Sequence, residues 1–394
     1  MHTVCLLNIA QWHQALHVLP IAAALSRRGD VDVHVAVARA GSIEPARALC
    51  ETLGAGGLTF RALWPKGLDG LTASARHPPK RLMLAAAAPF LAGCDALVAP
   101  ERTSLFLKRI GVRRPLMIHS DHGAGDRAVG FEPRIAQFDF ALLAGAKQEA
   151  RMLRERLIRP GRYRIVGYPK FEAAEASRGA QAPWFATPRP TVLYNPHFDA
   201  ALGSWDRFGA DVLRAFAAQS RFNLIFAPHI RLAQRVRGLA DLVAPFAALP
   251  HVHVDLGGAR SCDMTYARAA DIYLGDVSSQ VYEFIAQPRP CAFLDAGGVL
   301  SPDDPNTAHV RLGPIGRDGR DVLALVDRAV RTFGEHHPRQ LAAFADTFDL
   351  GERSCSERAA DAVVDAILQA RRARRRAPDP RATLAPALPR EPAP

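Results

Sequence analysis

The sequence predicts an α/β protein made of two doubly wound parallel-sheet domains with a cleft between them. Short apolar, β-branched runs alternate with longer helical patterns along most of the 394 residues, as in parallel sheets covered by helices. This alternation stops in residues 172–190, which are rich in Ala, Pro, Arg and Ser, and then resumes. The 48% hydrophobic content can supply two cores. We therefore expect domains at 1–171 and 191–370, joined by a linker at 172–190.

The first domain is expected to contain a sheet of short strands at residues 4–9, 31–37, 58–63, 96–99, 116–119, 138–143 and 163–167. Helical patterns fall at 15–28, 44–53, 103–110 and 147–157. Residues 4–10 lack a preceding basic region, which favours a strand over a signal peptide. The most apolar segment, 82–99, is interrupted by Pro89, Gly93 and Asp95, so we expect a buried helix and a strand rather than a membrane span.

The second domain repeats the pattern, with strands expected at 191–194, 223–227, 251–255, 272–274 and 291–294. Helices are expected at 209–218, 232–246, 322–332 and 356–370, besides one that follows residue 279. Residues 371–394 hold seven arginines and several prolines and are expected to be a disordered basic tail.

Charge and cysteine content narrow the function. The net charge is +11, but only 7% of residues are aromatic and none alternate with the basic runs, so a nucleic-acid partner is not expected. A basic protein suits anionic substrates near an anionic membrane surface. The six cysteines are scattered without a CxxC pair, which indicates reduced core residues of a cytoplasmic protein.

A polar turn follows the strand at 272–274. It contains Gly275, Asp276, Ser278 and Ser279, and Glu283 lies in the helix that begins there. Serine is a good helix N-cap, and free N–H groups at a helix start attract anions. The carboxyl end of a parallel strand is also where open α/β sheets bind ligands. The turn therefore predicts a phosphate site, with an ordinary capped helix as the alternative.

Histidines end three other strands. His122 stands in the Gly-rich turn His122-Gly123-Ala124-Gly125. His229 is followed closely by Arg231, whose guanidinium can donate hydrogen bonds to a phosphate. His197 follows the strand at 191–194 and has a structural turn residue as its alternative role. The HxxH spacing of His119 and His122 lies in a turn without a third ligand, so no metal site is predicted.

These turns resemble motifs of one family. The stretch ADIYLGDVSSQVYEF, followed by Pro288, is similar to the "aDiliTDYSS…fEf…P" motif of the CDP-glycerol glycerophosphotransferase family. His122-Gly123 resembles the family's HGT motif, although Ala124 replaces Thr and Arg127 stands in place of a later Lys. Residues 226–231 resemble its HP motif with Ile in place of Pro, and residues 194–197 match its YaPT motif loosely.

The resemblance implies a fold and an activity. Members of this family build teichoic-acid-like polymers and some capsules, with two Rossmann-like domains in the GT-B arrangement and without a cofactor. A CDP-activated polyol such as CDP-glycerol would bind mainly to the second domain. A glycan or lipid-linked acceptor would enter from the first. Its hydroxyl would attack the donor β-phosphate and CMP would leave.

The resemblance also suggests residue roles. His122 would be the general base, oriented by Asp121 or Asp126, since histidine titrates near neutral pH. His229 would stabilise the donor phosphates. Six further residues are expected to bind the donor: Gly123, Arg231, Asp276, Ser278, Ser279 and Glu283. Ser278 and Ser279 would hold the pyrophosphate and Glu283 the ribose, while Asp276 would either contact the donor or orient the turn. Arg127 and His197 are further candidate site residues.

Three other functions stay open. The first is a GT-B glycosyltransferase that uses a nucleotide sugar, and the second is a UDP-sugar 2-epimerase. Epimerases of that kind carry SGG where this chain has Ser278-Ser279-Gln280, which argues against the second. The third is a nucleotide-binding protein without catalytic activity. The arginines from 371 to 376 suggest a peripheral position on the inner face of the cytoplasmic membrane.

Overall fold

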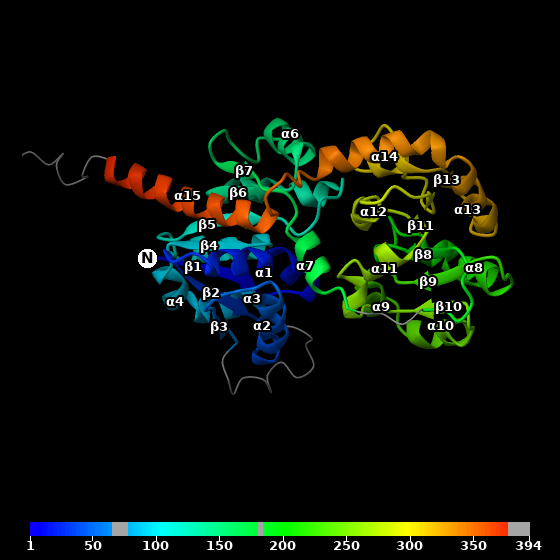
Figure 1. Ribbon diagram of the computed structural model, residues 1–394, viewed down its shortest axis with the longest axis horizontal. Helices are drawn as coiled ribbons and strands as arrows, with labels where there is room; N and C mark the ends of the chain where they lie inside the picture. Colours follow the sequence, from blue (N-terminus) through cyan, green and yellow to red (C-terminus); the bar gives the residue numbers. More distant parts are fainter. Residues whose placement is uncertain (65–77, 180–183, 377–394) are drawn as a thin grey trace, which may run out of the picture.

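The computed structural model describes residues 1–64, 78–179 and 184–376. They form two α/β domains that lie side by side, each with a parallel sheet between layers of helices (Figure 1). This confirms the predicted fold class. Part of the predicted linker, residues 180–183, and the tail from 377 onward lie outside the described residues.

The first sheet has the strand order β3-β2-β1-β4-β5-β6-β7, and all its ladders are parallel. Alternating valines such as Val31, Val33 and Val35 are buried in the core between this sheet and its helices. The order reverses between β1 and β4, which places a crevice at their carboxyl ends. The strands are β1 (His2–Asn8), β2 (Val31–Val37), β3 (Thr59–Ala62), β4 (Ala96–Ala99), β5 (Leu116–Ser120), β6 (Phe140–Leu143) and β7 (Tyr163–Ile165).

The helices of the first domain follow the predicted alternation, with shorter elements where the sequence breaks them. The segment at 103–110 is a 3₁₀ turn, η3 (Arg102–Leu105), followed by a single helical turn. Residues 82–99 contain the expected strand, but the single expected helix is divided into two short ones, the second of which begins next to Pro89. The helices are α1 (Trp12–Ser26), α2 (Ile43–Thr52), α3 (Lys80–Ala86), α4 (Ala88–Gly93), α5 (Phe106–Arg109), α6 (Ala146–Arg154) and α7 (Lys170–Ala176). The last of these overlaps the predicted linker at 172–190, so residues 172–176 of the linker are helical.

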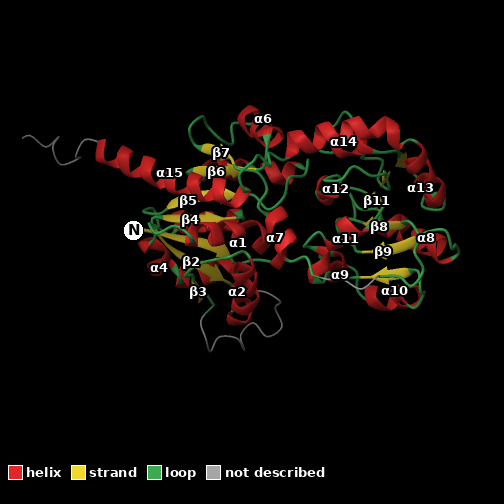
Figure 2. Cartoon of the chain, in the orientation of Figure 1, coloured by secondary structure: helices red, strands yellow, loops and turns green. Residues whose placement is uncertain are grey.

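The second sheet has the order β10-β9-β8-β11-β12-β13, also parallel throughout, and its order reverses between β8 and β11 (Figure 2, yellow strands). Its strands are β8 (Thr191–Asn195), β9 (Asn223–Phe226), β10 (Val252–Val254), β11 (Ile272–Gly275), β12 (Cys291–Leu294) and β13 (Ile315–Gly316). Its helices are α8 (Trp205–Ala217), α9 (Leu232–Arg235), α10 (Leu239–Ala247), α11 (Thr265–Ala269), α12 (Gln280–Phe284), α13 (Val322–Arg331) and α14 (Phe333–Thr347).

One prediction for the second domain was wrong in detail, and one helix was not predicted. The helix expected at 232–246 is divided into α9 and α10, because Gly238 between them adopts a left-handed backbone with φ of 70°. Helix α14 was not predicted, since Pro338 and a weakly periodic sequence hide it. It packs against α6 of the first domain.

Helix α15 (Cys355–Arg376) returns to the first domain and lies along α1, as Figure 1 shows in red. Its Val363 and Ile367 are buried in the same core as Leu16 of α1. The helix continues beyond the predicted end at 370, so the disorder expected from residue 371 was wrong for residues 371–376. Arg371 pairs with Asp95, and Arg374 donates to the Arg114 carbonyl, which anchors this extension.

Candidate active site

A cavity of about 360 Å³ lies between the domains, where the carboxyl ends of the central strands of both sheets face each other. Among the residues that the structure describes, its lining is rich in imidazoles and in permanent cations. The histidines are His13, His17, His122, His197, His229 and His309, and the cations are Arg102, Arg127, Lys170 and Arg231. The structure therefore brings most of the predicted site residues together: His122, Gly123, Arg127, His197, His229, Arg231, Ser278, Ser279 and Glu283.

His197 and His229 on the second-domain wall share one local geometry. The backbone N–H of Asp199 lies 3.1 Å from Nδ1 of His197, and the N–H of Arg231 lies 3.1 Å from Nδ1 of His229. A backbone N–H can only donate, so each Nδ1 acts as the acceptor and the proton of the neutral ring stands on Nε2. Burial, with the nearby arginines, lowers the pKa of His229 to about 3 and that of His197 to about 2. Both rings are therefore neutral hydrogen-bond donors.

The contact of His197 with Arg127 lacks an acceptor. Nη1 of Arg127 lies 2.6 Å from Nε2 of His197, yet the ring has a single lone pair, which faces the Asp199 N–H. A guanidinium has no acceptor atom, so two donor groups meet at this point. Burial lowers the pKa of Arg127. An anionic oxygen placed between Arg127 and His197 would accept from both.

His122 on the opposite wall has the reverse arrangement. Its Nδ1 lies 2.6 Å from the carbonyl oxygen of Pro100, which can only accept, so Nδ1 carries the proton and Nε2 keeps its lone pair. The carboxylate of Asp121 accepts the backbone N–H of His122 at 2.7 Å and thus holds the turn. Asp126, the other predicted partner, does not contact His122. The ring of His13, whose pKa burial lowers, lies 5.7 Å from that of His122.

Asp276 is fully buried and does not line the cavity. Its carboxylate accepts the backbone N–H of His197 at 2.9 Å, and the N–H and hydroxyl of Ser204 at 2.6 and 2.7 Å. Burial raises its pKa, against the effect of these donors. Of its two predicted roles, the geometry favours the structural one, because Asp276 fixes the turns after β8 and β11 relative to each other.

The serine turn differs from a simple helix cap. Ser279 occupies the N-cap position with helical backbone angles and makes no side-chain cap, while the hydroxyl of Ser278 accepts the Gln280 N–H at 3.2 Å. Helix α12 has only five residues, fewer than expected. A Cβ at Gly125 would come within 3.0 Å of the Ser279 Cβ, so glycine allows the first-domain loop to approach this turn closely.

Glu283 connects the two domains. Lys170 donates to both of its carboxylate oxygens at 2.7 Å, and the Tyr168 hydroxyl donates to one of them at 2.9 Å. All three side chains are buried. Because these bonds already hold Glu283 in place, its predicted contact with a ribose is not the role that its present geometry indicates.

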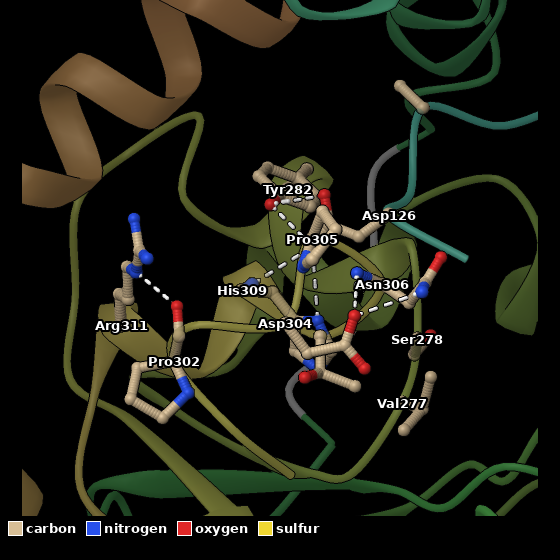
Figure 3. A network of polar contacts seen from close by, with 12 residues as sticks. Asp126, Val277, Ser278, Tyr282, Pro302, Asp304, Pro305, Asn306, His309 and Arg311 are labelled. Atoms are coloured by element: carbon tan, nitrogen blue, oxygen red, sulfur yellow. Dashed lines mark hydrogen bonds and ion pairs between the residues drawn. The ribbon is translucent and has the colours of Figure 1, made fainter. Parts of the chain in front are cut away.

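Asp126 is the centre of a second buried connection, which Figure 3 shows. The Tyr282 hydroxyl lies 2.8 and 2.7 Å from its two oxygens, the His309 N–H donates at 2.9 Å, and Lys147 pairs with it at 3.1 Å. Burial opposes ionisation, but His309 and Lys147 together lower the pKa of Asp126. The His309 ring also bonds the Asp276 carbonyl at 2.8 Å. We call Asp126, Lys147, Tyr282 and His309 the interdomain clasp.

The clasp continues through Arg151, which donates to the side chain of Asn306 at 2.9 Å. Sequence reasoning missed these residues, because Lys147 and Arg151 lie on a helix and His309 follows a segment without periodicity.

The described residues contain no group of three or more His, Cys, Asp or Glu side chains placed to hold a metal ion.

Comparisons with known proteins give the fold but no family. No protein-family profile and no curated protein sequence matches the chain. A Listeria monocytogenes protein described as a UDP-N-acetylglucosamine 2-epimerase has a similar structure, with a TM-score of 0.62 at 12% identity over 96% of this chain and 98% of its own. The Neisseria meningitidis UDP-GlcNAc 2-epimerase bound to UDP-GlcNAc gives 0.53 at 11% identity over 94% and 100%.

The wall teichoic acid polymerase TagF, in a crystal soaked with CDPG, is also similar. Its TM-score is 0.61 at 11% identity, over 93% of this chain and 89% of that one. These neighbours are GT-B enzymes, and the match extends over both of their domains. The two parallel sheets, the cavity between them and the C-terminal helix that returns to the first domain agree with that architecture, so this chain has the two-domain GT-B fold.

Proposed function

We propose that this protein transfers glycerol phosphate, or a related polyol phosphate, from a CDP-activated donor to a hydroxyl group of a glycan or lipid-linked acceptor. The supporting observation is the opposite hydrogen bonding of the histidines on the two walls. His122 offers a lone pair, while His197 and His229 offer N–H groups. A transferase of this kind needs a proton acceptor on the acceptor side and anion donors on the donor side.

In the reaction, the acceptor oxygen attacks the β-phosphorus of the donor, and the bond from that phosphorus to the bridging oxygen breaks. CMP leaves with the bond electrons, and the hydroxyl proton passes to Nε2 of His122. The Pro100 carbonyl keeps the ring oriented through Nδ1. The protein thus positions groups and stabilises charge, as is usual in phosphoryl transfer.

The donor phosphates are expected to lie against Arg127, His197, His229 and Arg231. A phosphate oxygen between Arg127 and His197 would remove their donor-to-donor contact at 2.6 Å. Ser278 and Ser279 line the same cavity and are expected to contact the pyrophosphate. Preference for cytidine rests on the similarity of residues 270–288 to the glycerophosphotransferase motif.

Two measurements test this proposal. Thermal shift with CDP, CMP, UDP and UMP is expected to show the larger stabilisation with the cytidine nucleotides, and a ligand at a hundred times its Kd stabilises by about 2.7 kcal/mol. Incubation with CDP-glycerol and acceptor should release CMP. Release of a nucleoside diphosphate from a nucleotide sugar would instead identify a glycosyltransferase, and acceptor-independent isomerisation of a UDP-sugar an epimerase.

The membrane contact suggested by the arginines remains part of this proposal. No helix in the described part of the chain is both long and apolar enough to cross a bilayer. Arg371 and Arg374 are engaged with Asp95 and Arg114, so a membrane contact would involve the exposed end of α15. Salt-sensitive binding to anionic vesicles that is lost on truncation after Ala370 would support it, and equal binding of the truncated protein would contradict it.

A further inference from the structure

A second cavity, of about 340 Å³, opens on the first-domain side of His122. It lies between the start of α1, the segment after β4 and the 3₁₀ helix Pro133–Gln137, and Arg231 of the second domain also lines it. His122, Arg102 and Arg231 also line the cavity between the domains, so the two cavities meet at the proposed base. A molecule in the second cavity would thus lie beside His122.

The second cavity is predominantly cationic. Among the described residues, the cavity is lined by one carboxylate, Glu101, which is paired with Lys80, and by four basic side chains: Lys80, Arg102, Arg134 and Arg231. Oε2 of Glu132 lies 3.3 Å from Nε of Arg102 and 2.9 Å from Nε of Arg134. One carboxylate therefore holds both guanidinium groups in place. Positioned arginines of this kind bind phosphate with two hydrogen bonds each.

The same cavity has acceptor atoms without partners. Oε1 of Glu101 and Oε1 of Gln14 are buried without a hydrogen-bond partner among the described residues, and these residues are only 7% and 5% exposed. Gln11, just before α1, also has an unpartnered Oε1 and makes no side-chain cap to the helix. Buried polar atoms are normally satisfied, so hydroxyl groups of a ligand are the expected donors.

We propose that this second cavity binds the acceptor, and that the acceptor is a hydroxyl compound that carries a phosphate group, such as a polyol phosphate. The phosphate lies against Arg102 and Arg134, hydroxyl groups donate to Glu101, Gln11 and Gln14, and the reacting hydroxyl reaches His122. The assignment of this compound as an acceptor rests on the proposed transferase function. The binding of a phosphorylated polyol in this cavity does not.

The first test measures binding of glycerol 3-phosphate to protein saturated with CMP, by calorimetry, with glycerol as the uncharged probe. We expect saturable binding of glycerol 3-phosphate only. Arg134→Gln should weaken it roughly tenfold, because a hydrogen bond to a charged group is worth about 1.5 kcal/mol or more. Arg134→Lys should retain part of the affinity. Arg214→Gln is the matched control, since Arg214 is also exposed and paired with a nearby acid, Asp211.

Unchanged binding in Arg134→Gln, or competition between glycerol 3-phosphate and CMP, would overturn the proposal. Gln11→Leu gives an independent variant and should weaken binding by removing a hydroxyl acceptor. If CMP does not bind, the titration is run on the free protein, where sensitivity to Arg134 still supports the cavity while the donor assignment fails. A glycerol phosphodiester probe separates the two sources of phosphate: tighter binding of the diester points to a polymer or lipid-linked end, and tighter binding of the monoester to a free polyol phosphate.

Discussion

The two walls of the interdomain cavity use the same side chain for opposite purposes. On the second-domain wall, a backbone N–H fixes Nδ1 of His197 and of His229 as an acceptor, so Nε2 donates. On the first-domain wall, a backbone carbonyl fixes Nδ1 of His122 as a donor, so Nε2 accepts. The main chain on the far side of each ring therefore decides whether the imidazole suits an anion or a proton. Residue type alone does not distinguish the two.

Removal of the accepting imidazole should have the largest effect. His122→Ala is expected to lower the rate of transfer by about 10²–10⁴-fold, the usual contribution of a general base. CMP affinity should remain near wild type, because the donor contacts lie on the other wall. Steady-state CMP release and calorimetry on the same preparation separate the two quantities.

The matched control for His122 is His336→Ala. Nδ1 of His336 also faces a backbone carbonyl, that of Arg311 at 3.1 Å, but His336 does not line either cavity. This variant should keep wild-type turnover. A folded His122→Ala protein that turned over normally, or that no longer bound nucleotide, would show that the two walls do not divide the work in this way.

The clasp keeps the walls opposed, so breaking it should destabilise the protein. Asp126→Ala removes the partner of Tyr282, Lys147 and His309 and is expected to cost about 3–5 kcal/mol in the free energy of unfolding, as for a broken buried pair. Guanidinium denaturation measures this loss. Asp365→Ala, at an exposed ion pair with Arg164, should change it by less than about 1 kcal/mol. Equal losses in the free energy of unfolding for the two variants would contradict a stabilising role of the clasp.

Loss of a donating imidazole should have a smaller effect, and it should fall on binding. His229→Ala is expected to weaken CDP binding about tenfold, the loss of one hydrogen bond to a charged group, and to slow transfer as well. Ser278→Ala with Ser279→Ala should weaken nucleotide binding without unfolding the protein. If the dissociation constants of both folded variants matched wild type, the donor phosphates would have to bind elsewhere.

The strand ends were predictable from the sequence, and the connections between the domains were not. His122, His229 and Ser278 each follow a run of apolar, β-branched or aromatic residues, and such runs place the next polar residue at the edge of a parallel sheet. Asp126, by contrast, bonds Tyr282 and His309, which stand 156 and 183 positions away. No local period links such residues, so Asp126 was assigned to the neighbouring His122. Glu283 was assigned to a ribose from the family resemblance, and its bond to Lys170 could not be foreseen because Lys170 is remote in sequence.

A buried neutral histidine such as His119 should affect the pH dependence of stability. Burial lowers the pKa of His119 to about 4, from 6.5 when exposed. Below pH 6.5 the unfolded chain binds a proton that the native site does not, so stability falls as the pH drops from 6.5 towards 4. Each such histidine contributes up to about 1.4 kcal/mol per pH unit. His119→Gln should make the slope shallower by that amount in urea denaturation between pH 6.5 and 4.5, and an unchanged slope would contradict the argument.

Because of helix α15, the two domains are completed at different times during synthesis. Its Val363 and Ile367 complete the core around α1 of the first domain, although both sheets precede them in the chain. The first domain therefore leaves the ribosome with the apolar face of α1 uncovered. All strands of the second domain, by contrast, are synthesised before α15 emerges. The first-made domain is thus the last to be completed. Until α15 docks, the apolar face of α1 stays exposed, and exposed apolar surface of this kind makes incomplete chains prone to aggregation.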